Sequence, residues 1–576
     1  MNIFSFFEVE FQTIINQLVS ADLLSGDIDT SRVVFELPRD ESHGDLATNA
    51  AMVLAKQAAK SPRDLAALFA TELAKIDGVI SVDIAGPGFL NLTIESRLWT
   101  REIADILSAN LTYGKSDIGA GEPVNVEFVS ANPTGPLHAA HARGAVIGDA
   151  LAGLMAFCGW NVTREYYIND AGGQVDVLAR STYLRYCEAL GRDIGAIPAG
   201  LYPGLYLKDV GQALAARDGE LYLDKPEAEW LETVRGFAID AIMQGIKTDL
   251  LALGIKMDQF SSERAIVNSG AVGRAIDKLQ QDGHLYQGVL QPPKGKEPEG
   301  WEPRKQLLFR ASEFGDDTDR PLQKSDGSWT YFAADVAYHL DKLERTGGAL
   351  INIFGADHGG YVKRMTAAVA ALSGMQNMLD IKLCQLVNLL DNGQPVKMSK
   401  RAGTFVTVED VIEAVGADVI RFIMLTRRND QTLDFDFAKV TEQSRDNPVF
   451  YVQYAHARAC SVIRQFEKDR KIPETANLGL ITDPAELTVV KMLVGWPKIV
   501  ESAANAHEPH RIAFYLVDLA SRFHSLWNAG RENPSLRFIL DDDGATTAAR
   551  MQLVQATSFV IRTGLNVLSI KALEEM

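Results

Sequence analysis

Residues 124–144 read VNVEFVSANPTGPLHAAHARG, and this stretch decides the fold of the region around it. Its first residues alternate between apolar and polar types, which is typical of a β-strand. Proline and glycine then interrupt the chain before His138, and apolar residues recur at helical spacing from Ala142 to Gly159. The segment NVTREYYI at 161–168 alternates again. A strand, a helix and a second strand in this order predict a β-α-β unit and therefore a parallel sheet.

A second unit of the same kind follows later in the chain. ALINIF at 349–354 reads as a strand, 361–372 has a helical pattern, and IKLCQLVNLL at 381–390 is apolar again. Between the two units, residues 170 to about 320 are rich in helical patterns and end in the polar stretch QPPKGKEPEGWEPRK, which is typical of a surface loop. We therefore expect an α/β domain over 111–445, with a Rossmann-like parallel sheet that is split by a helical insertion at about 170–320.

The two ends of the chain differ from this centre. Residues 1–110 mix a helical pattern (LATNAAMVLAKQAA, 46–59) with alternating strands (SVDIAGPGFLNLTI, 81–94), so we expect an α+β domain. After about residue 446 every segment is helical, which predicts an all-α bundle over 446–576. A chain of 576 residues is also too long for a single core.

Composition limits the classes of function. The net charge of -18 argues weakly against a nucleic-acid partner, although binding depends on local basic patches. There is no run of about 18 apolar residues that would span a membrane. The N-terminus carries acids and no Lys or Arg before Arg32, so we expect no secretion signal and a cytoplasmic location. Structural zinc and disulfides are not expected, because the cysteines are widely separated, at Cys158, Cys187, Cys384 and Cys460.

His138 and His141 stand three residues apart at the start of the predicted helix. A zinc site would favour HExxH and a third ligand, and neither the glutamate nor a nearby cysteine is present. A phosphate site fits better, because a helix N-terminus beyond the carboxyl end of a parallel strand attracts anions and imidazoles add hydrogen-bond donors. Plain packing in the first helical turn remains open.

Lys397 and Lys400 form a second candidate motif, in GQPVKMSKRAGTFVTVEDV at 393–411. They precede a helix that begins with a capping box between Thr407 and Asp410. Such a lysine pair is consistent with a solvated basic loop. Two ammonium groups on a loop also suit the binding of a triphosphate.

The HxxH and KMSK motifs, in this order and separated by an insertion, resemble the HIGH and KMSKS signatures of class I aminoacyl-tRNA synthetases. The surrounding sequences resemble bacterial arginyl-tRNA synthetases almost from end to end. The resemblance is carried by VEFVSANPTGPLHAAHARGAVIGDALAGLM, SDGSWTYFAADVAYHLDKLER, FGADHGGY and VKMSKRAGTFVTVEDVIEAVGADVIRF. HGDLATNAAMVLAK and GPGFLNLTI resemble the additional N-terminal domain of that family, and YVQYAHARACSVIR resembles the start of its helical anticodon-binding domain.

The resemblance implies a ligase that converts arginine and ATP to arginyl-adenylate and transfers the arginyl group to the 3′-terminal adenosine of tRNA(Arg). ATP with Mg²⁺ would be a substrate complex, and the protein is expected to be a monomer. The catalytic side chains would stabilise charge, and none would be a covalent nucleophile: His138, His141, Lys397 and Lys400. The motif's glycine and isoleucine are replaced here by Ala140 and Ala139. The methyl group of Ala140 is expected to shift the bound adenine slightly.

A pocket for arginine should contain carboxylates, because a guanidinium keeps its charge. Tyr331, Asp335 and Tyr338 share one face of a predicted helix, and alanines and a valine flank Asp335. A solvent-facing aspartate is the alternative. The family match implies that Glu127 meets the amino group of the substrate and that Asn132 also contacts the substrate. Glu127 as a plain surface acid remains open.

The resemblance also implies residues that bind ATP and tRNA. Those expected at ATP are Pro133, Thr134, Gly135, Gly355, Asp357, His358, Met398 and Ser399. Phe89 and Asn91 match the family's contact with the tRNA D-loop, and a core Phe with a turn Asn is the alternative. Tyr454 and Arg458 form an aromatic and basic stripe that suits stacking on anticodon bases. Tyr451, on the same stripe, is expected to belong to the core.

Two other functions compete with this interpretation. A cytidylyltransferase-like nucleotidyltransferase shares an HxGH motif, but it would need neither the C-terminal bundle nor Asp335. An inactive tRNA-binding paralogue should have lost the lysine pair or the histidines, and this chain has both.

Overall fold

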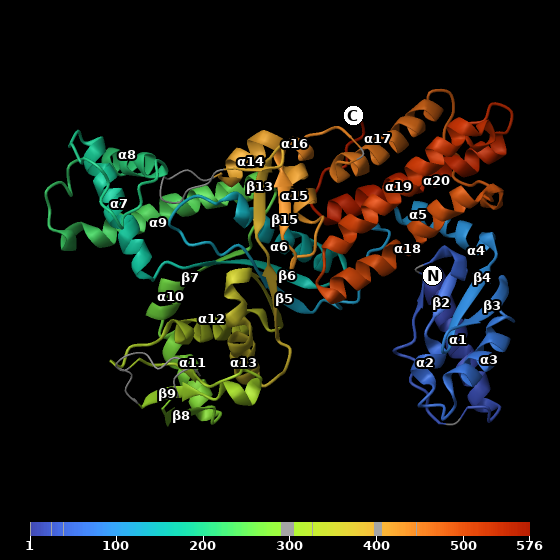
Figure 1. Cartoon of the computed structure of the whole chain (residues 1–576), viewed down its shortest axis with the longest axis horizontal. Helices are drawn as coiled ribbons and strands as arrows, with labels where there is room; N and C mark the ends of the chain where they lie inside the picture. Colours follow the sequence, from blue (N-terminus) through green and yellow to red (C-terminus); the bar gives the residue numbers. More distant parts are fainter. Residues whose placement is uncertain are drawn as a thin grey trace.

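The computed structural model describes residues 2–576 apart from 25, 39, 290–304, 325, 397–405 and 445. Within these ranges the centre of the molecule is a sheet of five parallel strands, as the sequence predicts (Figure 1). In spatial order the strands are β12 (Leu379–Cys384), β11 (Ala349–Gly355), β5 (Pro123–Glu127), β6 (Asn161–Ile168) and β7 (Gln259–Ser262).

Helix α6 (Ala139–Phe157) connects β5 to β6 and is buried on almost every side. Its glycines allow this close packing, because a Cβ at Gly148 would lie 2.2 Å from the ring of Phe128 and one at Gly153 would lie 2.9 Å from the carbonyl oxygen of Val567. From β5 the chain first builds β6 and β7 on one side and later adds β11 and β12 on the other. The strand order therefore reverses between β5 and β11, and ligands bind at such a reversal in open α/β sheets.

The interval expected as one helical insertion is only partly helical. Helices α7 (Gly173–Ala189), α8 (Tyr206–Asp218) and α9 (Glu227–Ala252) form a lobe around a small core of their own, which includes Trp230. Strand β7 then joins the central sheet, so the helical part ends well before residue 320. With four residues and the sequence QFSS, β7 is too short and polar to show a period in the sequence. The elements that follow it are α10 (Glu263–Asn268), α11 (Ala271–Gln281), β8 (Leu285–Gly288), β9 (Gln306–Phe309) and β10 (Arg320–Pro321).

The second β-α-β unit is present, with α12 (Tyr331–Thr346) before it and α13 (Val362–Ser373) between β11 and β12. The apolar run at 381–390 is not one strand, because it divides into β12 and β13 (Val387–Asp391). β13 belongs to a separate small sheet with β14 (Gln394–Pro395) and β15 (Leu433–Asp436). The short helices near this sheet are α14 (Val408–Val415), α15 (Ala417–Met424) and α16 (Phe437–Val440).

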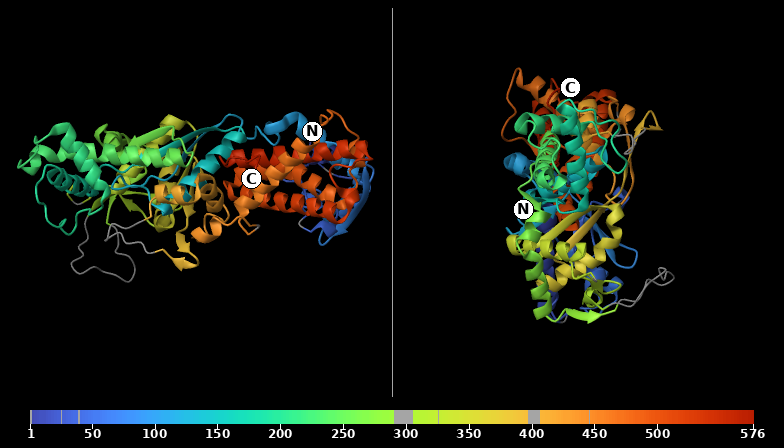
Figure 2. Two further views of the ribbon diagram at one scale, coloured as in Figure 1. Left: turned by 90° about the horizontal axis from the view of Figure 1, so that it is seen from above. Right: turned by 90° about the vertical axis from the view of Figure 1, so that its left-hand side faces the viewer.

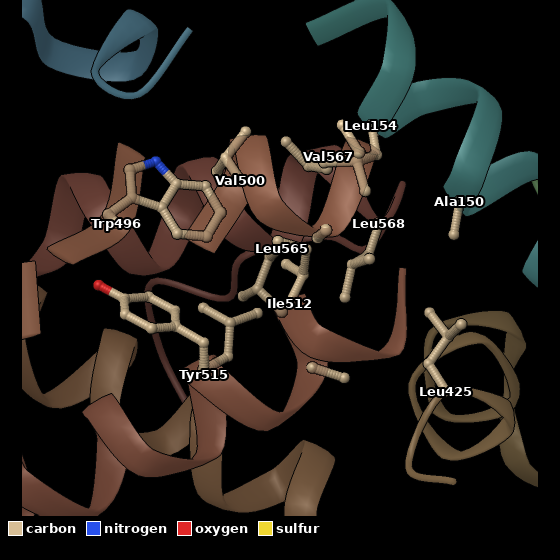
Figure 3. Packing of buried hydrophobic residues seen from close by; sticks show 14 of the residues in the cluster. Ala150, Leu154, Leu425, Trp496, Val500, Ile512, Tyr515, Leu565, Val567 and Leu568 are labelled. Carbon is tan, nitrogen blue, oxygen red and sulfur yellow. The ribbon is translucent and has the colours of Figure 1, made fainter. Parts of the chain in front are cut away.

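The C-terminal part is an all-α bundle, as predicted. Its helices are α17 (Pro448–Glu467), α18 (Pro484–Ala506), α19 (His510–Glu532) and α20 (Gly544–Val567). The bundle packs directly on α6 through apolar side chains. Figure 3 shows Leu154 of α6 beside Val567 at the end of α20, with Leu568, the next residue, close by. Leu425, which follows α15, lies on the side of Ala150 of α6. Among the described residues no helix is both long and apolar enough to cross a bilayer.

The N-terminal domain is α+β, as expected. Its helices are α1 (Ile3–Ser20), α2 (Ala50–Leu54) and α3 (Pro62–Leu73), and its antiparallel sheet has the order β1 (Phe35–Glu36), β2 (Leu46–Thr48), β4 (Phe89–Ile94) and β3 (Val79–Ala85). The prediction of a helix over 46–59 is only partly correct, because the first residues of this range form a strand that pairs with β4. Helices α4 (Ser96–Thr100) and α5 (Glu102–Ala109) pack on the C-terminal bundle. This domain and the insertion lobe lie at opposite ends of the molecule (Figure 2).

Candidate active site

A cavity of about 670 Å³ opens beyond the carboxyl ends of β5 and β11, where the strand order reverses. A second cavity of about 360 Å³ lies next to it and shares Ala131, Asn132 and His141 in its wall. The residues expected to bind arginine all line the larger cavity: Glu127, Asn132, Tyr331, Asp335 and Tyr338. Residues far apart in the chain therefore meet at one place in the fold.

The two histidines lie at the N-terminus of α6. His138 is the N-cap residue, and its backbone N–H donates to Nδ1 of His141 over 3.1 Å. The two ring centroids are 4.8 Å apart. Because Nδ1 of His141 accepts this bond, the neutral ring carries its proton on Nε2. His141 lines both cavities and His138 lines the smaller one, so both imidazoles border the space where a ligand would bind.

The two lysines of the second motif, and Met398 and Ser399 between them, lie outside the described residues. The chain on either side of 397–405 is described and is held by backbone hydrogen bonds. Val396 N–H donates to Leu389 O over 2.9 Å. Ala139 N–H donates to Val406 O over 3.0 Å, and Val408 N–H donates to Leu137 O over 2.9 Å. The sequence that follows the lysines therefore runs antiparallel to the histidine segment.

The larger cavity contains two carboxyl groups, of Asp335 and Glu263, that form no ion pair within the described part of the chain, although the positive charge of Arg364 acts on Asp335 and opposes the rise in its pKa that burial causes. Asp335 is half-buried and accepts a hydrogen bond from the hydroxyl of Tyr361. Burial raises the pKa of Asp335 to about 7, and the negative charges of Glu263 and Glu127 add to this effect. Burial and the nearby Asp170 likewise raise the pKa of Glu263. Among the described residues no Lys, Arg or His forms an ion pair with Asp335 or Glu263, so this end of the cavity favours a cationic ligand.

Glu127 differs from Asp335, because its charge is already matched. Its carboxylate accepts from Lys342 Nζ over 2.7 Å, and both side chains are almost fully enclosed. It also accepts from the hydroxyls of Tyr338 (3.0 Å) and Ser130 (3.1 Å). Lys342 donates further to Asn352 Oδ1 over 2.8 Å. The alternative of a plain surface acid at Glu127 is therefore wrong, and its contact with the amino group of the substrate remains a prediction.

Sequence reasoning missed two residues of this site, Glu263 and Lys342. Lys342 lies seven residues after Asp335 and four after Tyr338, so it shares their face of the helix. This spacing could have predicted that Lys342 belongs to the site. Glu263 follows β7 directly, and because that strand gives no periodic signal, nothing in the sequence marked it.

Most of the residues expected at ATP border one of the two cavities. Gly355, Asp357 and His358 line the larger one, while Thr134 and Gly135 line the smaller. Pro133 is buried and lines neither of the two cavities.

Tyr206 of the insertion closes one side of the smaller cavity. Its hydroxyl donates to Thr134 O over 2.6 Å, and a Cβ at Gly135 would lie 3.1 Å from that hydroxyl. Ala140, which replaces the motif glycine, is exposed in the first turn of α6.

The residues expected to meet tRNA lie outside these cavities, on other domains. Phe89 is exposed, and with Asn91 it lies on the same face of β4, so the alternatives of a core Phe and a turn Asn are wrong. In the bundle, the Arg458 guanidinium lies 4.4 Å from the ring centroid of Tyr454 and 4.8 Å from that of Trp527. Tyr451 is partly buried against the core, as expected.

Three family models match the sequence. They are described as the arginyl tRNA synthetase N terminal domain (residues 8–94), the class I (R) tRNA synthetase catalytic domain (102–189) and the DALR anticodon binding domain (452–576). Together with the reversal point of the parallel sheet and the histidine pair beside it, these matches define a class I aminoacyl-tRNA synthetase.

Similar proteins narrow the class to one family. Arginine–tRNA ligases of Ruegeria pomeroyi and Parvibaculum lavamentivorans are each 55% identical to this chain, with 100% of both chains covered. The solved arginyl-tRNA synthetase of Thermus thermophilus shares the fold with a TM-score of 0.73 at 23% identity, over 98% of this chain and 99% of that one. The chain belongs to the arginyl-tRNA synthetase family, whose members use ATP.

Proposed function

We propose that this protein is an arginine–tRNA ligase. It joins arginine to ATP as arginyl-adenylate, and it then transfers the arginyl group to the 3′-terminal adenosine of tRNA(Arg). The observation that carries this proposal is the cavity beside the histidine pair, in which Asp335 and Glu263 form no ion pair among the described residues. A guanidinium keeps its charge at every working pH and suits such a pair of carboxyl groups.

In the first step, the carboxylate oxygen of arginine attacks the α-phosphorus of ATP. The bond from that phosphorus to the bridging oxygen breaks, and pyrophosphate leaves with Mg²⁺. Asp335 and Glu263 hold the guanidinium, and Glu127 and Asn132 orient the amino-acid end. Charge on the phosphates is stabilised by the N-terminus of α6 and by four side chains, none of which forms a covalent bond. These are His138, His141, Lys397 and Lys400.

In the second step, a hydroxyl of the terminal adenosine of the tRNA attacks the carbonyl carbon of the adenylate, and AMP leaves. The N-terminal domain, over about 1–110, contacts the tRNA through Phe89 and Asn91. The bundle from about 446 onwards contacts it through Tyr454 and Arg458, whose ring and guanidinium suit stacking on unpaired bases. We propose that the protein acts as a monomer in the cytoplasm, with Mg²⁺ entering as part of the ATP complex.

Exchange of pyrophosphate into ATP, measured with each of the twenty amino acids with and without total tRNA, tests this function. We expect arginine to support exchange and the other amino acids to give little. Exchange with a different amino acid would overturn the assignment of the substrate. A protein that binds tRNA but gives no exchange with arginine in either condition would instead be the inactive paralogue.

A further inference from the structure

Glu165 is a fully buried carboxylate that lies behind the wall of the larger cavity. It stands on β6 beside Glu127 of β5, because the two residues are register partners in the parallel sheet. Burial would raise the pKa of Glu165, but the positive charges of Lys342 and Arg345 lower it below its usual range. Glu165 is therefore ionised in the folded protein, although it lines neither of the two cavities.

Among the described residues, five hydrogen bonds reach the two carboxylate oxygens of Glu165. Oε1 accepts from Ser261 Oγ (2.6 Å), Arg345 Nη2 (2.8 Å) and the hydroxyl of Tyr338 (3.1 Å). Oε2 accepts from Asn125 Nδ2 (2.6 Å) and Arg345 Nη1 (3.2 Å). A carboxylate offers about four acceptor sites. Tyr338, the most distant donor on Oε1, is therefore the one held least firmly by that oxygen.

The hydroxyl of Tyr338 lies between two carboxylates but has a single proton. Its oxygen is 3.0 Å from Glu127 Oε2 and 3.1 Å from Glu165 Oε1. Burial and the two nearby negative charges raise the pKa of Tyr338 well above its usual value, so the hydroxyl keeps this proton. It can donate fully to only one carboxylate at a time, and rotation about the C–O bond turns the proton from one to the other.

Glu127 needs free acceptor sites if it binds the amino group of arginine. Its Oε1 accepts from Ser130 over 3.1 Å and its Oε2 from Lys342 over 2.7 Å, which leaves about one acceptor site on each oxygen. When Tyr338 donates to Glu127, the remaining site on Oε2 is occupied. When Tyr338 donates to Glu165, both sites are open to an ammonium group, which has three donors.

We propose that Glu165 is a positioning residue for arginine, which accepts the proton of the Tyr338 hydroxyl when the amino group of the substrate binds and so frees an acceptor site on Glu127. This inference rests on the proposed function. No covalent bond changes in this step, because only the hydroxyl rotates. Without the carboxylate of Glu165, the hydroxyl would either compete with the amino group for Glu127 or stay buried with no acceptor, and both outcomes weaken binding.

Glu165→Gln, assayed by arginine-dependent pyrophosphate exchange, is the direct test. An amide oxygen has two acceptor sites, and Ser261 and Arg345 approach it more closely than Tyr338 does. The new amide nitrogen can donate to Oδ1 of Asn125, which has no partner among the described residues. We expect the KM for arginine to rise roughly tenfold, about the effect of losing one hydrogen bond to a charged group. Because the interaction is lost equally from ground state and transition state, kcat should stay within about twofold.

The decisive measurement is Glu165→Gln in a Tyr338→Phe background. Phenylalanine keeps the ring that stacks on Tyr167, at a centroid distance of 4.2 Å in the wild type, but it has no proton to place. We expect the double variant to have a lower KM for arginine than Glu165→Gln alone, and one within about twofold of that of Tyr338→Phe. A role as a distant negative charge or as support for the fold predicts the same rise in both backgrounds, and that result would overturn the proposal.

Glu165→Asp separates position from charge. It keeps the negative charge but withdraws the carboxylate from the Tyr338 hydroxyl, so the KM for arginine should rise as it does for Glu165→Gln, and Tyr338→Phe should again suppress the rise. An unchanged KM in Glu165→Asp would show that only the charge matters and would also overturn the proposal. This variant carries the test if Glu165→Gln does not fold.

Glu486→Gln is the matched control, because Glu486 is an equally buried carboxylate that accepts from Arg550 Nε over 2.6 Å, within the C-terminal bundle. Its loss should lower the temperature of thermal unfolding and leave the KM for arginine within about twofold of the wild type. A tenfold rise in this control would mean that the KM reports general loosening, which contradicts the proposal. If the wild-type protein gives no exchange with arginine, the proposed function itself fails, which is a distinct outcome.

Discussion

Replacing Asp335 by asparagine removes one negative charge from the acidic cavity and leaves the size of the side chain and a partner for Tyr361 almost unchanged. Truncating one member of a buried charge pair costs about 2 to 5 kcal/mol. That cost corresponds to roughly 30- to several-thousand-fold in kcat/KM for arginine at about 1.4 kcal/mol per decade. Glu263 remains in the same cavity, so we expect the lower part of this range.

The raised pKa of Asp335 adds a dependence on pH. Only the ionised carboxyl pairs with a guanidinium, and the pKa in the folded protein is about 7. In the wild type, kcat/KM for arginine should therefore fall about tenfold for each pH unit below 7 and level off above it. The asparagine variant should lose the limb that is centred near pH 7, and the protonation of Glu263, whose pKa is also raised, should be what still lowers its kcat/KM in acid.

The same pKa predicts that the substitution stabilises the ligand-free protein. The pKa of Asp335 is higher in the folded protein than in the unfolded chain, so the folded state binds the carboxyl proton more tightly. This proton binding stabilises the fold at low pH, and the stabilisation is lost as the pH rises from 3.8 to about 7. At about 1.36 kcal/mol per pKa unit, this cost is on the order of 4 kcal/mol above pH 7. Asp335→Asn avoids it, so it should unfold at a higher temperature than the wild type at pH 8 without arginine.

Steady-state aminoacylation against arginine, with citrulline as a neutral competitor, measures the loss directly. Citrulline binding should lose less than arginine binding does, because citrulline has no charge to pair. ATP binding should be unchanged. If arginine kinetics of the variant stay within about twofold of the wild type, well below the cost of a buried pair, Asp335 does not bind the guanidinium and the reasoning is refuted.

Three further substitutions test other parts of the protein. Lys400→Ala should lower the activation rate by orders of magnitude and leave tRNA affinity nearly unchanged, since it removes a donor that acts mainly in the transition state; full turnover in pyrophosphate exchange contradicts this. Asn91→Ala should raise the aminoacylation KM for tRNA and spare arginine and ATP binding, so an unchanged KM for tRNA would remove Asn91 from the interface. Lys342→Met should leave Glu127 buried without a counter-charge and lower the free energy of unfolding by about 3 to 5 kcal/mol, and a denaturant titration showing a change below about 1 kcal/mol would count against this account.

The sequence by itself determined the local elements and the class of protein. Periods of two and about 3.6 residues report which face of a strand or helix is buried, so the two β-α-β units and the helical bundle could be predicted. Asp335 could be placed on one helix face with Tyr338 for the same reason. The prediction failed where a segment was too short to show a period, as at β7. It also failed at residues 46–48, where pairing with β4 decides the structure.

The tertiary structure alone decided which distant residues meet. Val406 lies beside Ala139, Lys342 neutralises Glu127, and Arg143 binds carbonyls more than 240 residues further along the chain. No local pattern encodes such pairs, because each depends on how the strands are ordered and how the intervening loops close. Glu263 reaches the acidic cavity only because β7 adds to the sheet beside β6. A four-residue strand with three polar residues takes that position through pairing with its neighbour rather than through any preference of its own.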